Sequence, residues 1–446
     1  MQPIRIESIA HGGDGVGTAA DGKRIFVPLA APGDLVDARI VEDRGRHARA
    51  ALARLIEPGP GRVEPACRHA GSCGGCQLPH LSYGTQLRAK EDAFYEALAR
   101  LGECPRDSIG AALPILPSPS PLRYRIRCKL AVRGKRAGYL RRQSDELEAV
   151  EECSLLVPAL EALALRVIAS LRERSIPHLA SVDLCVGDDD SGAAYLEPAS
   201  GAPQGWDARA ADLLRIEGIR GVIVAPAVGE PTRGKGRAAP PGQRAVPRVF
   251  GDPVVSRDAP GAPGVRLLGR PDVFAQAHAA ANEALVEAAV ESLAIAPGDE
   301  VLELYCGAGN FTFALASRGA KVTAVEAEGA SLSLARRASE ASRPRDVQLR
   351  FIAGDAVRVA AGFADEGRRF DAVLLDPPRA GAKGLAPILA RLAPRRIAYV
   401  SCDPPTLARD VKALRDVGYR PILARPVDMF PQTFHVEGLV AFERMV

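Results

Sequence analysis

A cysteine near residue 400 has the local sequence expected of a reactive thiol. The segment RIAYVSC predicts a buried strand that ends at Cys402, and Asp403 followed by two prolines is typical of a helix start. The thiol would then lie just ahead of a helix N-terminus, whose dipole favours the thiolate. A free cysteine is more often simple core packing, but the carboxyl end of a strand favours chemistry. We therefore predict that Cys402 is a nucleophile.

A glycine-rich turn about a hundred residues earlier predicts a cofactor site. VLELYCGAGNFTFALA indicates strand, turn and helix, and Gly307 and Gly309 would let the backbone approach a ligand closely. Glu326 ends the next predicted strand, where an acid suits the ribose hydroxyls of either a dinucleotide or S-adenosylmethionine. Asp355 and Asp376 close two later strands. Because three carboxylates suit a cationic cofactor without phosphates, we favour S-adenosylmethionine over a nicotinamide dinucleotide.

A group of cysteines near residue 70 predicts a metal site. Cys67, Cys73 and Cys76 form C-x5-C-x2-C in CRHAGSCGGC, and a fourth ligand must come from elsewhere in the chain. Nine cysteines, an odd number, in a chain of 446 residues indicate metal binding or catalysis rather than a disulfide framework. The spacing alone fits zinc or an iron–sulfur cluster, with zinc the commoner of the two.

The elements that must position these motifs predict three domains. In residues 1–60, short apolar stretches between glycine turns indicate a small antiparallel β-barrel. Residues 61–270 indicate an α+β central domain, with helices at Gln86–Leu101 and near Pro158–Arg174. In residues 271–446, helices alternate with apolar strands, which predicts an α/β fold with a doubly wound, Rossmann-like parallel sheet.

The charge distribution is informative locally rather than overall. A net charge of +4 does not by itself indicate nucleic-acid binding. The stretch Arg62–Arg142, however, carries 15 lysines and arginines against 6 acids. Within it, basic and apolar residues alternate from Arg123 to Leu130, which predicts a strand with one phosphate-contacting face. The segment 228–248 predicts a mobile basic loop. The sequence has neither a signal peptide nor a run long enough to cross a bilayer, so we expect a cytoplasmic protein without membrane partners.

Three motifs together resemble the bacterial uracil-5 RNA methyltransferases, in particular the iron–sulfur branch that acts on 23S ribosomal RNA. The motifs are LYCGAGNF, LLDPPRAG at Leu374–Gly381 and SCDPPTLARD at Ser401–Asp410, and the resemblance covers nearly the whole chain. It implies that Cys402 adds to C6 of a uracil, which makes C5 able to attack the methyl of S-adenosylmethionine. It also implies that Glu437, in DMFPQTFHVEGLV, is the base that then removes the C5 proton.

The resemblance further implies the ligand sets. The residues expected to line the cofactor and target pocket are Gln276, Tyr305, Asn310, Glu326, Asp355 and Asp376. A [4Fe–4S] cluster would be held by Cys67, Cys73, Cys76 and, as the fourth ligand, Cys153, with an architectural or RNA-shaping role. The N-terminal barrel, with its GGDGVG turn, resembles the RNA-binding TRAM domain. His278 is a departure, because the family usually has Asn there, and this puts local substrate contacts in question.

Two other functions are weighed against the ribosomal one. Transfer RNA is the rival substrate, although family members that act on it generally lack both the barrel and the cysteine cluster. A non-catalytic RNA-binding or chaperone protein is the rival class, and the intact Cys402, Glu437 and DPPRAG segment count against it. We expect a monomer that binds its target uridine single-stranded or flipped out, because C6 must meet a thiol inside a pocket.

Overall fold

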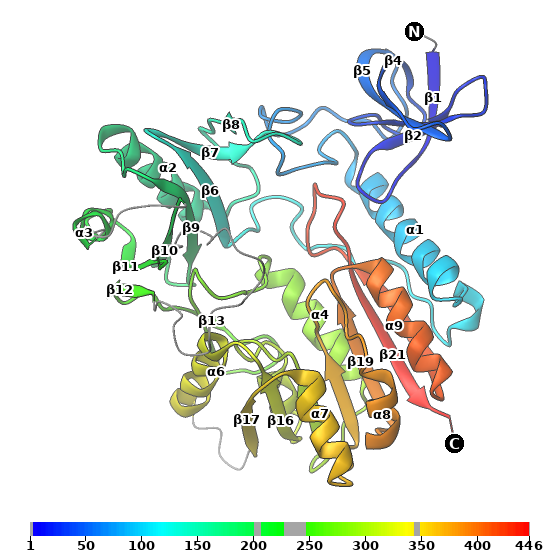
Figure 1. Ribbon diagram of the computed structural model, residues 1–446, viewed down its shortest axis with the longest axis vertical. Helices are drawn as coiled ribbons and strands as arrows, with labels where there is room; N and C mark the ends of the chain where they lie inside the picture. The colour runs from blue at the N-terminus through cyan, green and yellow to red at the C-terminus, as the bar shows by residue number, and fades with distance from the viewer. Residues whose placement is uncertain (1–2, 200–206, 227–246, 343–347, 446) are drawn as a thin grey trace, which may run out of the picture.

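The computed structural model describes residues 3–199, 207–226, 247–342 and 348–445. Four β-structures follow one another along the described residues: a closed barrel, a seven-stranded central sheet, a two-stranded hairpin and a seven-stranded C-terminal sheet flanked by helices (Figure 1). The predicted basic loop at 228–248 falls almost entirely outside the described residues. No helix in the described ranges is long and apolar enough to span a membrane.

The N-terminal barrel confirms the prediction of a small β-domain. Its strands are β1 (Pro3–Ile9), β2 (Gly15–Thr18), β3 (Arg24–Val27), β4 (Leu35–Asp43) and β5 (His47–Glu57), in the closed order β1-β2-β3-β5-β4. Alternate apolar side chains such as Ile4, Ile6 and Val27 fill its interior. The barrel is not purely antiparallel as predicted, because β3 and β5 pair in parallel. Alternating apolar residues predict a strand but carry no information on its direction.

The central sheet combines strands from residues 127–251. Its order is β12-β11-β10-β9-β6-β7-β8. The strands are β6 (Arg127–Arg133), β7 (Arg136–Leu140), β8 (Leu147–Glu148), β9 (Leu179–Val186), β10 (Gly192–Pro198), β11 (Ile219–Val224) and β12 (Arg248–Gly251). The predicted helix α2 (Pro158–Glu173) packs its leucine-rich side on this sheet, and α3 (Asp207–Leu214) lies by β11 and β12. A separate hairpin, β13 (Val255–Asp258) and β14 (Arg266–Gly269), leads toward the C-terminal sheet.

The C-terminal sheet is the predicted doubly wound one. Its order is β17-β16-β15-β18-β19-β21-β20, with β15 to β19 parallel and β21 antiparallel to both of its neighbours. The strands are β15 (Glu300–Leu304), β16 (Lys321–Glu326), β17 (Leu349–Ala353), β18 (Ala372–Leu375), β19 (Arg396–Ser401), β20 (Tyr419–Val427) and β21 (Glu437–Arg444). The helices are α4 (Ala279–Ser292), α5 (Thr312–Ser317), α6 (Gly329–Ser342), α7 (Ala356–Asp365), α8 (Ala386–Leu392) and α9 (Pro404–Asp416). One apolar core lies under α4 and α5 and the other under α7, α8 and α9, so both faces are covered.

Part of the stretch assigned to the central domain packs on the C-terminal sheet instead. Helix α1 (Tyr83–Leu101) lies beside α9, and its Phe94 belongs to the same apolar core (Figure 1). After the short 3₁₀ helix η1 (Arg106–Ser108), the chain runs along the edge of the sheet, where Ala112 pairs in parallel with Ala424 of β20. Residues 83–116 therefore lie within the sequence range predicted for the central domain but pack on the C-terminal domain.

Candidate active site

The glycine-rich turn lies between β15 and α5, at the carboxyl edge of the C-terminal sheet. Gly307 and Gly309 have positive φ angles of 56° and 96°, a region that favours glycine. A Cβ on Gly307 would meet nothing within 4 Å, whereas a Cβ on Gly309 would lie 2.7 Å from the Phe313 ring. Gly307 lines the cavity described below and Gly309 does not. The predicted ligand approach therefore fits Gly307, while Gly309 allows the turn to pack closely on α5.

The three predicted carboxylates end successive strands at this edge. Glu326 ends β16, and its carboxylate accepts hydrogen bonds from the Gly307 amide at 3.0 Å and the Glu328 amide at 2.7 Å. Asp355 caps the N-terminus of α7. Asp376 follows β18 at the cavity wall, where burial raises its pKa to about 7. Glu326 is thus fixed to the glycine turn, which orients it toward any ligand bound there.

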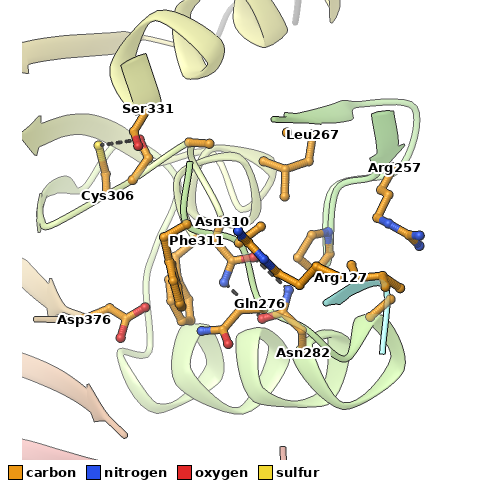
Figure 2. Close-up of a pocket in the computed structure, with 18 of the residues that line it drawn as sticks. Arg127, Arg257, Leu267, Gln276, Asn282, Cys306, Asn310, Phe311, Ser331 and Asp376 are labelled. Carbon is orange, nitrogen blue, oxygen red and sulfur yellow. Dashed lines mark hydrogen bonds between the residues drawn. The ribbon is translucent and has the colours of Figure 1, made fainter. Parts of the chain in front are cut away.

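Amide side chains line the opposite side of the cavity. Asn310 of the turn and Asn282 of α4 exchange hydrogen bonds, with N···O distances of 2.7 and 3.0 Å. Figure 2 shows Gln276 beside this pair and Asp376 pointing into the cavity from the other side. Tyr305, which precedes the turn with a positive φ of 66°, also lines the cavity. The asparagine pair fixes the turn to α4, a structural role for Asn310 besides the predicted one.

Cys402 lies between β19 and the N-terminus of α9, as predicted. Asp403 is the N-cap residue and a proline begins the helix. The predicted lowering of the thiol pKa is wrong, however. Burial and the neighbouring Glu437 and Asp376 raise the pKa of Cys402 to about 11, although Arg379 opposes them. Loss of water and two nearby carboxyl groups therefore set the direction of the shift in the thiol pKa.

Glu437 begins β21, the strand next to β19. The pairing of Ser401 with Gly438 brings the neighbouring residues Cys402 and Glu437 to the same end of the two strands. Glu437 is 2% exposed, and its Oε2 has no hydrogen-bond partner in the described part of the chain. Burial, with Asp376 nearby, raises the pKa of Glu437 to about 8. A carboxyl group beside a thiol, with a pKa close to neutral pH, is suited to proton transfer.

Two residues at the site were given no role from the sequence. The guanidinium of Arg379 lies against Cys402 and lowers the pKa of both Cys402 and Glu437. His435 lines the cavity, and burial lowers its pKa to about 4, so it is neutral at pH 7. Both lie within recognised motifs, LLDPPRAG and DMFPQTFHVEGLV, which is the signal that could have identified them.

One cavity of about 1240 Å³ joins these groups. Its lining includes most of the predicted site residues: Gln276, Tyr305, Gly307, Asn310, Glu326, Asp355, Asp376, Cys402 and Glu437. It continues between the central sheet and the β13–β14 hairpin, where Arg127 and Arg257 contribute to its wall (Figure 2). The nucleophile, the candidate base and the cofactor turn therefore share one cavity that reaches the central domain.

The four predicted cluster cysteines come together on the central domain. They are all free thiols: Cys67, Cys73, Cys76 and Cys153. The pKa of Cys76 is raised to about 12, chiefly by burial, with Arg125 opposing and the other three thiols adding to the increase. Within the described ranges, no group of three or more His, Cys, Asp or Glu side chains is close enough to hold a metal ion. The thiols are thus neighbours without forming a single-ion site.

The predicted basic strand is shorter than expected and part of its charge is paired, while its contact with phosphates stays a prediction. Strand β6 begins only at Arg127, and Arg123 has a positive φ of 55°. Arg123 forms an ion pair with Glu161, and Lys129 forms one with Glu197 at 2.5 Å. Arg127 donates to two backbone carbonyls and lines the cavity. The alternation was read correctly, but the sequence could not show that acids from distant elements neutralise part of this charge.

His278 has a structural role. Its Nδ1 accepts a hydrogen bond from the Ala281 amide at 3.3 Å and so caps α4. Its Nε2 lies 2.6 Å from the Ser118 hydroxyl, and its ring stacks on Tyr124 at 4.5 Å. Burial lowers the pKa of His278, which keeps the ring neutral. An asparagine also caps helices, so the exchange of Asn for His preserves this function.

The strand order, the glycine turn and the strand-end carboxylates define an S-adenosylmethionine-dependent methyltransferase. Residues 269–445 match the sequence profile of the tRNA (Uracil-5-)-methyltransferase family, and residues 1–53 match the TRAM domain. The 23S rRNA (uracil(1939)-C(5))-methyltransferase RlmD of Aeromonas hydrophila is 35% identical over 99% of this chain and 97% of its own. The enzyme of the same name from Pseudomonas putida is 35% identical over 99% of this chain and 93% of its own.

A solved structure agrees with these relatives. The tRNA (uracil-54, C5)-methyltransferase of Pyrococcus abyssi, in complex with S-adenosyl-L-homocysteine, superimposes with a TM-score of 0.72 and 25% identity. The alignment covers 99% of this chain and 100% of the other. The chain therefore belongs to the RNA uracil-5 methyltransferase family, which confirms the predicted family, fold and enzyme class.

Proposed function

We propose that this enzyme forms 5-methyluridine in 23S ribosomal RNA, with Cys402 as the nucleophile and Glu437 as the base. The observation that carries the proposal is that both side chains line the cavity that also contains the Gly307 turn. A thiol, a carboxyl group and a methyl-donor site in one cavity are what methylation of uracil C5 requires.

The chemistry follows from the position of the two side chains. Cys402 loses its proton to water and its sulfur bonds to C6, while the C5=C6 electron pair moves onto the C4 carbonyl as an enolate. S-adenosylmethionine supplies a methyl group on a positively charged sulfur, which C5 attacks while the S–CH₃ electrons stay with the leaving sulfur. Glu437 then takes the C5 proton. The C–H electrons re-form C5=C6, the C6–S bond breaks, and Cys402 leaves as a thiolate.

The residues around the turn fit S-adenosylmethionine. The Gly307 turn has open space beside it, and Glu326, fixed to the Gly307 amide, would bind the ribose hydroxyls. Asp376 affects the pKa of both Cys402 and Glu437, so it lies where the methyl donor and the uracil would meet. Gln276, Tyr305, Asn310 and Asp355 complete the proposed binding set.

Ribosomal RNA is favoured by the relatives of known activity. The aligned 23S ribosomal RNA enzymes are up to 35% identical to this chain, against 25% for the transfer RNA enzyme of Pyrococcus abyssi. The presence of a barrel was expected to separate ribosomal from transfer RNA enzymes. It does so less well than expected, because that transfer RNA enzyme aligns with 99% of this chain, including the barrel region. The barrel therefore does not separate the two substrates, and transfer RNA stays the second candidate.

We also propose that the four clustered cysteines hold a [4Fe–4S] cluster with an architectural role. The support is that four free thiols from two segments affect one another's pKa. Iron and sulfide analysis of anaerobically purified wild-type and Cys153→Ser protein tests this. Equal iron content in both would overturn the assignment.

The proposed division of labour follows the three predicted domains. Residues 1–60 would bind RNA as the TRAM barrel, residues 61–270 would carry the cluster and further RNA contacts, and residues 271–446 would perform methyl transfer. The enzyme would act as a monomer. RNA as the substrate also implies work in the cytoplasm.

Mapping of 5-methyluridine tests the function. A strain lacking the gene is complemented with wild-type protein or with Cys402→Ala, and ribosomal and transfer RNA are analysed by mass spectrometry. We expect the wild-type protein to restore 5-methyluridine in 23S ribosomal RNA and Cys402→Ala to restore none. Restoration only in transfer RNA would select the second candidate, and restoration by Cys402→Ala would refute the mechanism.

A further inference from the structure

The segment 428–436 joins β20 to β21 and leads directly into Glu437. In Figure 1 it is the red loop that rises from the C-terminal sheet beside α1. Phe430 and His435 of this segment line the cavity. Its path therefore sets one wall of the active site and the point at which the carboxyl group of Glu437 enters.

A buried ion pair ties this segment to α1. The Lys90 ammonium donates to Asp428 Oδ1 at 2.5 Å and to the Phe430 carbonyl at 2.9 Å. The side chains of Lys90 and Asp428 are 1% and 0% exposed. No residue of α1, a helix described throughout, lines the cavity. Lys90 therefore acts on the reaction indirectly, and the segment that it holds is its direct link to the cavity wall.

Five further hydrogen bonds reach the middle of the same segment. Two hydrogen bonds join Gln86 of α1 to Gln432. The backbone amide of Gln432 donates to Gln86 Oε1 at 2.9 Å, and Gln86 Nε2 donates to the side-chain Oε1 of Gln432 at 3.1 Å. The backbone amides of Gln77 and Leu78, just after the cysteine loop, both donate to the Gln432 carbonyl. The Tyr124 hydroxyl donates to the Pro431 carbonyl at 3.0 Å. The segment is thus fixed from outside the sheet at several points.

Stability alone does not account for the ion pair. Taking two charges out of water costs free energy, and well-packed apolar residues of similar size are often as stable or more so. The pair instead gives the segment a defined position. Lys90 makes a charge-assisted hydrogen bond to Asp428 and a second hydrogen bond to the Phe430 carbonyl, and together they fix where the chain enters β21. A base must lie within hydrogen-bond reach of the proton that it removes, so this position matters for proton transfer.

We propose that Lys90 and Asp428 are positioning residues that hold the segment 428–436 so that Glu437 faces the C5 proton of the RNA adduct. The proposal rests on the proposed function of Glu437. It assigns the pair to one step only, the removal of the C5 proton that re-forms C5=C6 and breaks the bond between C6 and Cys402. Addition of the thiol and transfer of the methyl group do not require Glu437 to be in place as a base.

The test separates that step from the earlier ones. The double variant Lys90→Met/Asp428→Leu replaces the pair with apolar side chains of similar size and leaves no buried charge unpaired. Gln86→Leu removes the paired amide contacts of the same segment. Arg100→Met, which breaks the exposed Arg100–Glu96 pair on α1, is the matched control. Unmodified 23S ribosomal RNA from a strain lacking the gene is the substrate, and quenched-flow sampling follows methyl transfer and the covalent RNA adduct.

We expect the double variant and Gln86→Leu to transfer methyl in the first turnover at a rate close to that of the wild-type protein. Release of RNA should be slower by about tenfold in the double variant, so the adduct accumulates. A tenfold loss is smaller than the full effect of a general base, because Glu437 is displaced rather than removed. Arg100→Met should match the wild type. A release rate equal to the wild type in the folded variants, or an equal loss in both steps, would overturn the proposal. If the wild-type protein itself forms no adduct at Cys402, the proposed function fails instead.

Discussion

The raised pKa of Cys402 predicts an unusual dependence of its reactivity on pH. With a pKa of about 11, roughly one thiol in a thousand is ionised at pH 8, whereas an ordinary thiol with a pKa near 8.5 is about a quarter ionised. A more basic thiolate is intrinsically more nucleophilic by about tenfold over this range, so alkylation at pH 8 should be slower by about 20-fold. The rate should also rise about tenfold per pH unit from pH 7 to 10.

Peptide mass spectrometry after timed exposure to iodoacetamide measures this rate for Cys402 alone, and the urea-unfolded chain provides the reference. Two variants should move the rate at pH 9 in opposite directions. Glu437→Gln removes a carboxylate that raises the thiol pKa and should speed alkylation, while Arg379→Gln removes a cation that lowers it and should slow alkylation. A plateau in the wild-type rate below pH 9 would refute the reasoning, because it would mean that the helix dipole prevails over burial.

Two further predictions concern the cofactor site and the barrel. Glu326→Gln should weaken S-adenosylhomocysteine binding by about 10- to 100-fold, as expected for the loss of a charged hydrogen-bond acceptor. The control Glu340→Gln, on the exposed side of α6, should leave the affinity unchanged. Equal affinities of the two variants by isothermal titration calorimetry would contradict the role of Glu326. Asp34→Asn in the barrel should lower the free energy of unfolding by about 3 kcal/mol at pH 7, because buried Asp34 pairs with Arg62 at 2.6 Å. Burial alone would raise the pKa of Asp34, but bonds from Arg62, Gly59 and Ala31 lower it overall. The stabilisation should therefore be lost as the pH falls through that lowered pKa, and urea unfolding that shows a constant difference down to pH 2 would argue against it.

The features predicted correctly are those determined by residues close together in the sequence. The strand, turn and helix around Gly307 and the strand-to-helix junction at Cys402 follow from short-range patterns, and the structure has both. The parallel sheet also followed, because the order of elements along the chain determines where strand ends meet.

Features that depend on distant residues were the ones missed. The pKa of Cys402 is raised by burial and by Glu437, 35 positions away. Likewise, the charges of Arg123 and Lys129 are neutralised by acids from other elements, and α1 packs on a sheet formed mostly by the last third of the chain. None of these pairings leaves a signal in a single sequence.

The central claim is that Cys402 bonds to the uracil and Glu437 releases it. Incubation of Glu437→Gln with S-adenosylmethionine and unmodified 23S ribosomal RNA, followed by nuclease and protease digestion and mass spectrometry, tests both roles at once. The account predicts a peptide in which Cys402 carries one methylated uridine. Turnover at the wild-type rate without such an adduct, or an adduct on another residue, would contradict it.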